Sequence, residues 1–299
     1  MSLKLLNLTK TFENKEAVKN LNIEMKEKRT LGIIGQNGSG KTTTFRMILG
    51  LLKPTYGEII WKGKAITHIN PDAIGYLPEE RGLYSDMTIE DQLLFFAELK
   101  GKKRKEISPQ IDGWLERLAV KGKKKDKIKT LSKGNQQKIQ LISTIIHKPE
   151  IVILDEPFSG LDPVNAELLK DTIFELKKKG TTLIFSSHRM DHVEELCDDI
   201  CLLQNGTSLL KGDINEIKSK FGKKKIILRS HHQEHEINNL PGVESVNKVS
   251  DKLIIYLKDQ SYRESVFEYV VKDGFVETFS AETPNLEEIF KAKVGEKNE

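Results

Sequence analysis

The chain has little cysteine and no long apolar run. Two cysteines in 299 residues, Cys197 and Cys201, are too few for a disulfide framework, which favours a reducing cytosol. No apolar stretch approaches the roughly 18 residues that a membrane-spanning helix needs. Residues 1–4 place no basic segment before an apolar one, so we expect no signal peptide. These absences disfavour the secreted, disulfide-rich and integral-membrane classes.

Charge imbalance is also slight. The formal net charge of +4 by itself indicates neither a nucleic-acid binder nor an acidic partner. Hydrophobic residues make up 37% of the chain and charged residues 31%, which is ordinary for a globular protein. Because 299 residues exceed one typical domain, we expect two domains.

A glycine-rich stretch carries the strongest signal. Residues 35–42 have the spacing Gly-x4-Gly-Lys-Thr and follow an apolar strand pattern at 31–34. Glycines let successive backbone N–H groups approach phosphate oxygens, where a Cβ would block them. The helix predicted over 41–51 presents its dipole-positive end to the same anion. We therefore predict a nucleoside triphosphate site in which Lys41 reaches the β- and γ-phosphates and Thr42 binds Mg²⁺.

Acidic residues follow another apolar strand pattern, residues 151–154. Asp155 and Glu156 thus stand at the carboxyl end of a predicted buried parallel strand, the edge at which open α/β sheets place their chemistry. Asp155 suits Mg²⁺ ligation, and Glu156 suits polarising the water that attacks a γ-phosphate. His188 follows the strand pattern at 181–185 and is expected level with this pair, although a lone histidine is more often structural.

Helix-capping residues and one aromatic complete the candidate set. Ser132 is a natural N-cap ahead of a helix predicted over 138–147, and Asp162 caps a helix running to about residue 179. Phe12 lies in a turn, 11–15, between strands predicted at 4–8 and 21–25. It is either a core residue or a platform on which adenine stacks.

Three other features favour ordinary structural explanations. Residues 100–129 are strongly basic, but without interleaved aromatics a solvated helix face is favoured over nucleic acid or lipid binding. The histidine-rich stretch 231–235 favours a polar surface turn over a metal site, because no set of ligands completes a recognisable geometry. Cys197 and Cys201 have helical spacing and favour small buried residues.

In this order, the segments resemble the ATP-binding subunit of ABC transporters over residues 3 to about 212. The matching segments are residues 35–42 for the Walker A motif, 131–137 for the signature motif, 151–156 for Walker B, 159–162 for the D-loop and His188 for the switch histidine.

The resemblance implies an α/β fold, a P-loop NTPase core with a mixed sheet and a helical subdomain at about 86–147, within an ATPase domain of residues 1–212. It also implies ATP and Mg²⁺ as cofactors, Glu156 as general base, and His188 as the residue that holds the γ-phosphate and positions the water. The implied ATP contacts are Phe12, Gly35, Asn37, Gly38, Ser39, Gly40, Lys41, Thr42, Thr43, Ser132, Gly134, Gln136 and Asp162. The implied metal contacts are Thr42, Glu79 and Asp155.

The family further implies a head-to-tail dimer, in which Ser132 and Gly134 of one subunit contact the γ-phosphate held by Lys41 of the other. Closure of this dimer on ATP would drive a separately encoded membrane permease, at the cytoplasmic face of a bacterial cell membrane. The residues leave open whether the second ATPase subunit is a copy of this chain, and they do not name the cargo.

Two positions depart from the family pattern. Glu79 stands where the family usually has a glutamine that senses Mg²⁺ and contacts the permease, and an ionised glutamate offers only acceptors. Lys133-Gly134-Asn135 replaces Gly-Gly-Gln in the signature. Because Gly134, whose N–H must approach phosphate, is retained, we expect function to survive.

Residues 213–299 lie outside the ATPase pattern. Helix patterns at 214–221, 262–271 and 284–293 alternate with strand patterns at 225–229, 243–247, 252–257 and 275–279. They suggest a small α+β domain, for which a ferredoxin-like arrangement is one candidate. A comparable tail occurs in export-type ABC ATPases resembling sodium-efflux and drug-resistance subunits, so the resemblance implies an exporter of ions or small molecules.

Two alternative functions fit less well. A nucleic-acid- or ribosome-associated ABC ATPase would use residues 100–129, but such translation factors usually carry two ATPase units, and chromosome-maintenance ATPases carry long coiled coils. An inactive scaffold fits poorly with Lys41, Asp155, Glu156 and His188 all present. We therefore expect an ATP hydrolase that powers a permease and binds no nucleic acid.

Overall fold

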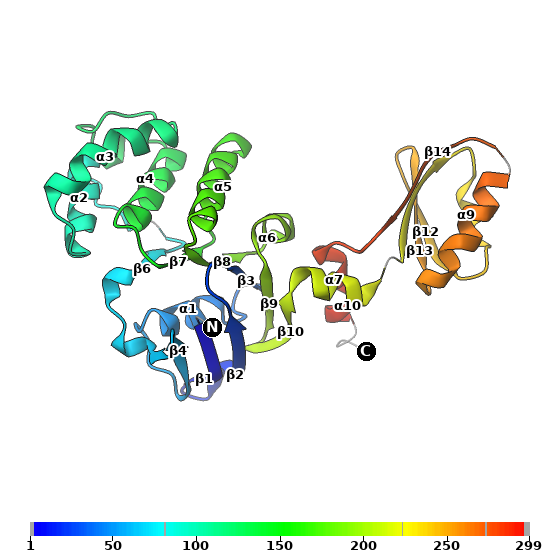
Figure 1. Cartoon of the computed structure of the whole chain (residues 1–299), viewed down its shortest axis with the longest axis horizontal. Helices are drawn as coiled ribbons and strands as arrows, with labels where there is room; N and C mark the ends of the chain where they lie inside the picture. The colour runs from blue at the N-terminus through cyan, green and yellow to red at the C-terminus, as the bar shows by residue number, and fades with distance from the viewer. Residues whose placement is uncertain (1–2, 81, 223, 273, 296–299) are drawn as a thin grey trace. The chain divides into compact units, whose positions relative to one another are not determined.

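The computed structural model describes residues 3–80, 82–222, 224–272 and 274–295 of the chain. The chain divides into two compact units, Met1–Gly212 and Asp213–Glu299 (Figure 1). Within the described residues, no helix combines the length and the apolar character needed to cross a bilayer.

A six-stranded sheet forms the centre of the first unit. In sheet order its strands are β10 (Thr207–Asp213), β9 (Asp199–Gln204), β3 (Thr30–Ile34), β8 (Thr182–Ser187), β7 (Ile151–Asp155) and β6 (Ile74–Leu77). From β9 to β6 all neighbours are parallel. Every residue of β3, β7 and β8 is buried, as continuous apolar strands covered on both faces should be. The three buried strands predicted from sequence are thus confirmed.

An antiparallel sheet packs over helix α1 (Lys41–Ile48), and its strands differ in length from the prediction. In sheet order they are β2 (Lys15–Met25), β1 (Leu3–Phe12), β4 (Tyr56–Trp61) and β5 (Lys64–Ala65). The turn predicted over 11–15 is present but shorter, at residues 13–14, because β1 continues to Phe12 and β2 begins at Lys15. Register shifts along β1, between Leu5 and Leu8 and again before Lys10, break the two-residue alternation by which strands are recognised.

Three helices lie together beside this core: α2 (Ile89–Leu99), α3 (Arg104–Arg117) and α4 (Lys133–Ile145) (Figure 1). Thr88 caps α2 by accepting a hydrogen bond from the Asp91 N–H. Helix α4 begins at Lys133 rather than at residue 138, because Ser132 caps it directly.

The basic segment in this group of helices is engaged by acids of the same chain. Lys125 Nζ lies 2.8 Å from Glu90 Oε2, and Lys129 Nζ lies 2.6 Å from Asp86 Oδ1. The lysine side chains are largely exposed, so the segment is a solvated surface that carries ion pairs.

Close packing of helix α6 (Met190–Leu196) against the six-stranded sheet depends on Gly32. A Cβ at this position of β3 would lie 2.8 Å from Val193 Cγ1 and 2.9 Å from Cys197 Sγ, in and after this helix. Cys197 follows α6 and Cys201 belongs to β9, so the two do not share a helix, and the prediction that both are small buried residues is confirmed. Both thiols are buried, and burial raises the pKa of Cys201 to about 11.

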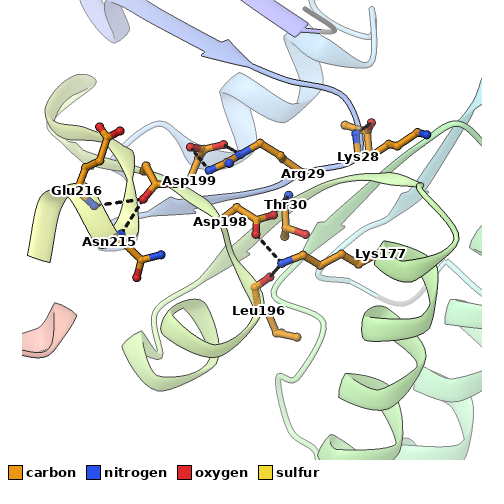
Figure 2. A network of polar contacts seen from close by, with 11 residues as sticks. Lys28, Arg29, Thr30, Lys177, Leu196, Asp198, Asp199, Asn215 and Glu216 are labelled. Atoms are coloured by element: carbon orange, nitrogen blue, oxygen red, sulfur yellow. Dashed lines mark hydrogen bonds and ion pairs between the residues drawn. The ribbon is translucent and has the colours of Figure 1, made fainter.

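A polar network fastens the amino ends of β3 and β9 (Figure 2). The Arg29 guanidinium donates to both carboxylate oxygens of Asp199, at 2.6 and 2.8 Å. Asp198 accepts a hydrogen bond from the Thr30 N–H at 2.8 Å and another from Lys177 Nζ, on helix α5 (Pro163–Lys178), at 2.7 Å. The Asp198 carboxylate therefore connects strand β3 to helix α5.

We expect Asp198→Ala to lower the free energy of unfolding by about 1–3 kcal/mol, because it leaves the N–H of fully buried Thr30 without this acceptor. Urea denaturation measures the difference. The exposed Asp191, which pairs with Arg189, serves as control, and Asp191→Ala should cost less than about 1 kcal/mol. Equal losses for the two variants would contradict the role assigned to Asp198.

The second unit is built around an antiparallel sheet. Along the chain its elements are β11 (Lys225–Ser230), α8 (Glu234–Asn238), β12 (Val243–Val249), β13 (Lys252–Leu257), α9 (Arg263–Lys272) and β14 (Val276–Glu282). The strand order is β12-β13-β11-β14, and every pairing is antiparallel. This is the β-α-β-β-α-β plan of a ferredoxin-like arrangement, which agrees with the predicted small α+β fold. Helices α7 (Ile214–Phe221) and α10 (Leu286–Gly295) contact each other outside the sheet (Figure 1).

The histidine-rich stretch is not the simple surface turn that was predicted. It contains α8, and His232 is only 7% exposed, with its ring 5.7 Å from that of Tyr269. Tertiary packing buries this histidine, which local polarity could not indicate. No cluster of three or more His, Cys, Asp or Glu side chains in the described part of the chain is placed to hold a metal ion.

Candidate active site

The glycine-rich loop lies between β3, which ends at Ile34, and α1, which begins at Lys41. Gly40 caps α1 with φ 107°, and a Cβ there would lie 2.6 Å from the Ala17 carbonyl oxygen. Gly38 also has a positive φ, 80°. Only glycine fits the loop at position 40, and the resulting turn presents the free N–H groups of the first turn of α1 to an anion.

The Lys41 side chain folds back over this loop. Its ammonium donates hydrogen bonds to the Gly35 carbonyl at 2.8 Å and to the Gln36 carbonyl at 3.3 Å. The residue is only 7% exposed, so its stem is packed and its charge is held at the loop. A buried ammonium next to the N-terminus of a helix makes a strong site for a polyanion.

Three further polar side chains meet at the carboxyl edge of the sheet. Asp155, at the end of β7, accepts a hydrogen bond from Thr42 Oγ1 at 3.2 Å and one from Ser186 Oγ at 2.6 Å. Ser186 in turn accepts from the Glu156 N–H at 2.9 Å. The parallel register of β7 and β8 pairs Asp155 with Ser186, and this register brings the acids and the glycine-rich loop to the same edge.

Glu156 is buried and conformationally restricted. Its φ of 48° is in the left-handed region, which a non-glycine residue adopts only when the surroundings enforce it. Glu156 Oε2 lies 2.9 Å from Nδ1 of His188, whose side chain is 65% exposed. Burial raises the pKa of Glu156 above its ordinary value, while the neighbouring His188 and Lys41 oppose this rise. A carboxylate with a raised pKa is a better proton acceptor for a water molecule.

A cavity of about 810 Å³ opens between these groups. The predicted site residues that line it are Phe12, Asn37, Gly38, Gly40, Lys41, Thr42, Thr43, Glu79 and Glu156. Phe12 lies in the wall of the cavity and is 47% exposed. The alternative prediction, that Phe12 is a core residue, is therefore wrong. Gly35 and Ser39 belong to the loop beneath, while Asp155 and His188 join the cavity through their hydrogen bonds to Thr42 and Glu156.

Besides Gly35 and Ser39, four predicted ATP contacts do not line this cavity: Ser132, Gly134, Gln136 and Asp162. They cluster instead at the amino ends of α4 and α5, where Gly134 lies against Asn165 and Asp162 accepts a hydrogen bond from the Asn165 N–H at 2.9 Å. That hydrogen bond lowers the pKa of Asp162. Ser132 caps α4, and the Gln136 amide donates to backbone carbonyls of its own chain. The predicted residues thus form two groups within one chain.

Comparison with known proteins gives both units a family. Residues 18–159 match the model of the ABC transporter family, and residues 212–294 match that of the ATP-binding protein DrrA1-3-like C-terminal domain. An ABC transporter ATP-binding protein of Alkalihalophilus pseudofirmus is 51% identical over 88% of this chain and 98% of its own length. The chain belongs to the ABC transporter ATP-binding proteins. The predicted resemblance, the ATPase class and the ATP-binding function are confirmed.

Two further relatives and one solved structure support the same family. The protein YhaQ of Bacillus subtilis is 45% identical over 97% of both chains. The linearmycin resistance ATP-binding protein of the same organism is 34% identical over 74% of this chain and 72% of its own. Among solved structures, an ATP-binding subunit of an ABC transporter superposes with a TM-score of 0.69 at 28% identity, covering 74% of this chain and 94% of that one.

Sequence reasoning missed one wall of the cavity and one residue beneath it. The wall comprises Asn14, Lys15, Glu16, Ala17, Lys19 and Asn205, from the β1–β2 hairpin and the β9–β10 turn. Lysines at 15 and 19 are the sequence signal that could have pointed to it. The residue beneath is Ser186, which was not among the predicted site residues. Its bridge between Asp155 and Glu156 depends on the register of β7 and β8, which the sequence does not state.

We expect Ser186→Ala to lower kcat of the ABC ATPase by about tenfold, since the bridge contributes hydrogen bonds to one carboxylate and to the backbone of the other acid. Steady-state phosphate release separates kcat from KM, and KM should change little. Ser186→Thr retains the hydroxyl and should restore the rate. Ser187→Ala, which removes only an acceptor for the Arg189 N–H, is the control. Equal rates for the two alanine variants would contradict this role.

Proposed function

We propose that the chain binds ATP and Mg²⁺ in the 810 Å³ cavity, hydrolyses the γ-phosphoryl bond there, and thereby powers a separate membrane permease. The observation that carries the proposal is that Lys41, Thr42 and Glu156 line one cavity, while Asp155 is hydrogen-bonded to Thr42 and His188 to Glu156. A base, an electrophile and a metal-binding pair are the parts that phosphoryl transfer to water requires.

In this proposal the glycine-rich loop and Phe12 hold the nucleotide. Phe12 stacks on adenine, and Lys41 exchanges its loop carbonyls for the β- and γ-phosphates. The other phosphate contacts are Gly35, Asn37, Gly38, Ser39, Gly40, Thr42 and Thr43. The positive φ of Gly38 and Gly40 supports this arrangement, because it turns N–H groups toward the anion.

Mg²⁺ fits the oxygen donors of the same cavity. Thr42 Oγ1 and Asp155 Oδ2 share a hydrogen bond, and Glu79 adds a carboxylate from the loop after β6. Hydroxyl, carboxylate and phosphate oxygens are the ligands that Mg²⁺ prefers. Bound there, the ion would neutralise phosphate charge. Glu156 takes the proton of a water whose oxygen attacks the γ-phosphorus, and ADP leaves with the bridging oxygen while His188 orients the water.

The second group of predicted contacts serves a different subunit. Ser132, Gly134, Gln136 and Asp162 do not line the cavity of their own chain, which supports a site completed by another ATPase subunit, either a copy of this chain or a different one. In this arrangement the Ser132 end of α4 faces the γ-phosphate bound by the other subunit. Only a triphosphate spans both faces, so ATP favours the closed pair.

A groove of about 390 Å³ supports a permease contact at the cytoplasmic face of the membrane. Its lining is mostly apolar and includes Leu51, Ile74, Leu83 and Phe96, and it borders the loop that carries Glu79. Leu51 is 71% exposed, so a partner seated in the groove would bury further apolar surface there. Export of ions or small molecules is proposed from the resistance protein among the relatives.

Capture from detergent-solubilised membranes tests this function. The bait is Glu156→Gln with Mg-ATP, which should hold the closed state, and the control is Lys41→Met. Recovery of a multi-span membrane protein with the first bait and a weaker recovery with the second are expected. Recovery of ribosomes or nucleic acid without a membrane protein would overturn the proposal.

Glu79→Gln is expected to raise the Mg²⁺ concentration that half-saturates ATP turnover by roughly tenfold, because it removes a charged oxygen ligand. Mg²⁺ titrations of phosphate release at fixed ATP measure this shift. Glu80→Gln, at a residue that does not line the cavity, should leave the titration unchanged. Superimposable curves for Glu79→Gln and the parent would contradict the assignment.

A further inference from the structure

One buried amide holds the loop that carries Glu79. Gln140, on α4, is only 4% exposed, and its Nε2 donates hydrogen bonds to the Pro78 carbonyl at 3.3 Å and to the Glu80 carbonyl at 3.2 Å. These two carbonyls flank Glu79 in the chain. One side chain of α4 therefore donates hydrogen bonds to the backbone on both sides of Glu79, the residue of this loop that lines the nucleotide cavity.

The same helix is fixed to the preceding strand one turn later. Thr144 Oγ1 shares its single proton between the Gln140 carbonyl of its own helix at 2.9 Å and the Tyr76 carbonyl at 3.2 Å. The close approach of strand and helix depends on Gly75, where a Cβ would lie 2.4 Å from the Thr144 carbonyl oxygen. The end of β6 and the Glu79 loop are thus bonded to α4 at two successive turns, at Gln140 and Thr144. A displacement of the loop has to be taken up by the helix or break these bonds.

The Gln140 amide has one polar atom that is left without a hydrogen bond among the described residues. Within the described part of the chain its Oε1 is buried without a hydrogen-bond partner, which lowers stability compared with an apolar side chain of the same size. An apolar residue would in turn leave the two loop carbonyls without this donor. The donor function, rather than packing, explains why an amide stands here.

We propose that Gln140 is a positioning residue that couples the Glu79 loop to the Ser132 end of α4. The inference rests on the proposed function, in which Glu79 contacts the bound nucleotide and Ser132 faces the γ-phosphate of the other subunit. Helix α4 spans 13 residues from Lys133, directly after the Ser132 cap, to Ile145. Movement of Glu79 toward nucleotide is carried by Gln140 into the helix, so that nucleotide in one cavity adjusts the face offered to the second subunit.

Hydrogen exchange with and without Mg-ATP tests the coupling. The protein is kept at a concentration where it sediments as a single chain, so that no second subunit protects α4. Two variants remove the donor: Gln140→Glu keeps the shape of the side chain, and Gln140→Met replaces it with an apolar one. Ser143→Ala is the matched control, since the Ser143 hydroxyl donates only within α4, to the Ile139 carbonyl, and lines the same groove.

In the parent, Mg-ATP should slow exchange in residues 35–43 and change exchange in residues 132–138. Both Gln140 variants should keep the response at 35–43, which also shows that they are folded, and reduce the response at 132–138 by about threefold or more. Ser143→Ala should behave as the parent. Absence of a response at 35–43 in the parent would contradict the proposed function itself. A response at 35–43 without one at 132–138, or one that survives in both Gln140 variants, would overturn the coupling alone.

Discussion

Replacing Glu156 with glutamine should slow ATP hydrolysis by about a hundredfold to ten-thousandfold, the range expected when a general base is lost. The amide has nearly the shape of the carboxylate but cannot accept the proton of the attacking water. Glu156 is buried against His188, and burial raises the pKa of its carboxyl above the ordinary value. A raised pKa makes this carboxylate a better acceptor for the proton of water. Nucleotide affinity should be retained, since Glu156 is not among the groups assigned to hold ATP.

Single-turnover phosphate release measures this loss without interference from product release. Glu116→Gln, an exposed acid on α3, should leave the rate unchanged and controls for the loss of a negative charge. Hydrolysis by the Glu156 variant at the parental rate would show that another group accepts the proton.

Lys41→Met should weaken ATP binding by about tenfold to a hundredfold, because a charge-assisted contact to phosphate is lost. Methionine keeps much of the packed stem but cannot donate to the Gly35 and Gln36 carbonyls or to phosphate. Hydrolysis should fall as well, because the same ammonium stabilises the charge that develops on the transferred group.

Titration with a fluorescent ATP analogue gives the change in Kd for this variant. Lys127→Met removes an exposed positive charge from a segment that does not line the cavity and should bind with the parental Kd. Equal weakening by both substitutions would reduce the role of Lys41 to its contribution to net charge.

The main parts of the site could be predicted because each comes directly after an apolar strand. Strands β3, β7 and β8 are continuous buried runs, and the loops at the carboxyl ends of parallel strands meet at one edge of the sheet. The placement of Lys41, Glu156 and His188 near one another is a consequence of that rule. The bridge made by Ser186 is not, because it depends on which residue of β8 lies opposite Asp155.

Pairing between distant segments explains two further differences from the prediction, the length of the first hairpin and the burial of His232. Irregular register along β1 hid the full length of the first hairpin, and the hairpin folds over the glycine-rich loop so that the Ala17 carbonyl lies close to Gly40. Local patterns therefore missed the wall that β2 contributes to the cavity. The burial of His232 has the same origin, since Tyr269, which covers it, is far away in sequence.

Calorimetric titration of Mg-ATP into Glu156→Gln is the most direct test of whether the cavity around Lys41 and Glu156 binds the nucleotide that the chain hydrolyses. In this variant turnover is suppressed while the proposed contacts to ATP remain. We predict saturable binding of one ATP per chain, which is strongly weakened when Lys41→Met is added. Absence of saturable binding, or binding that is unaffected by the added Lys41→Met, would contradict the assignment of this cavity.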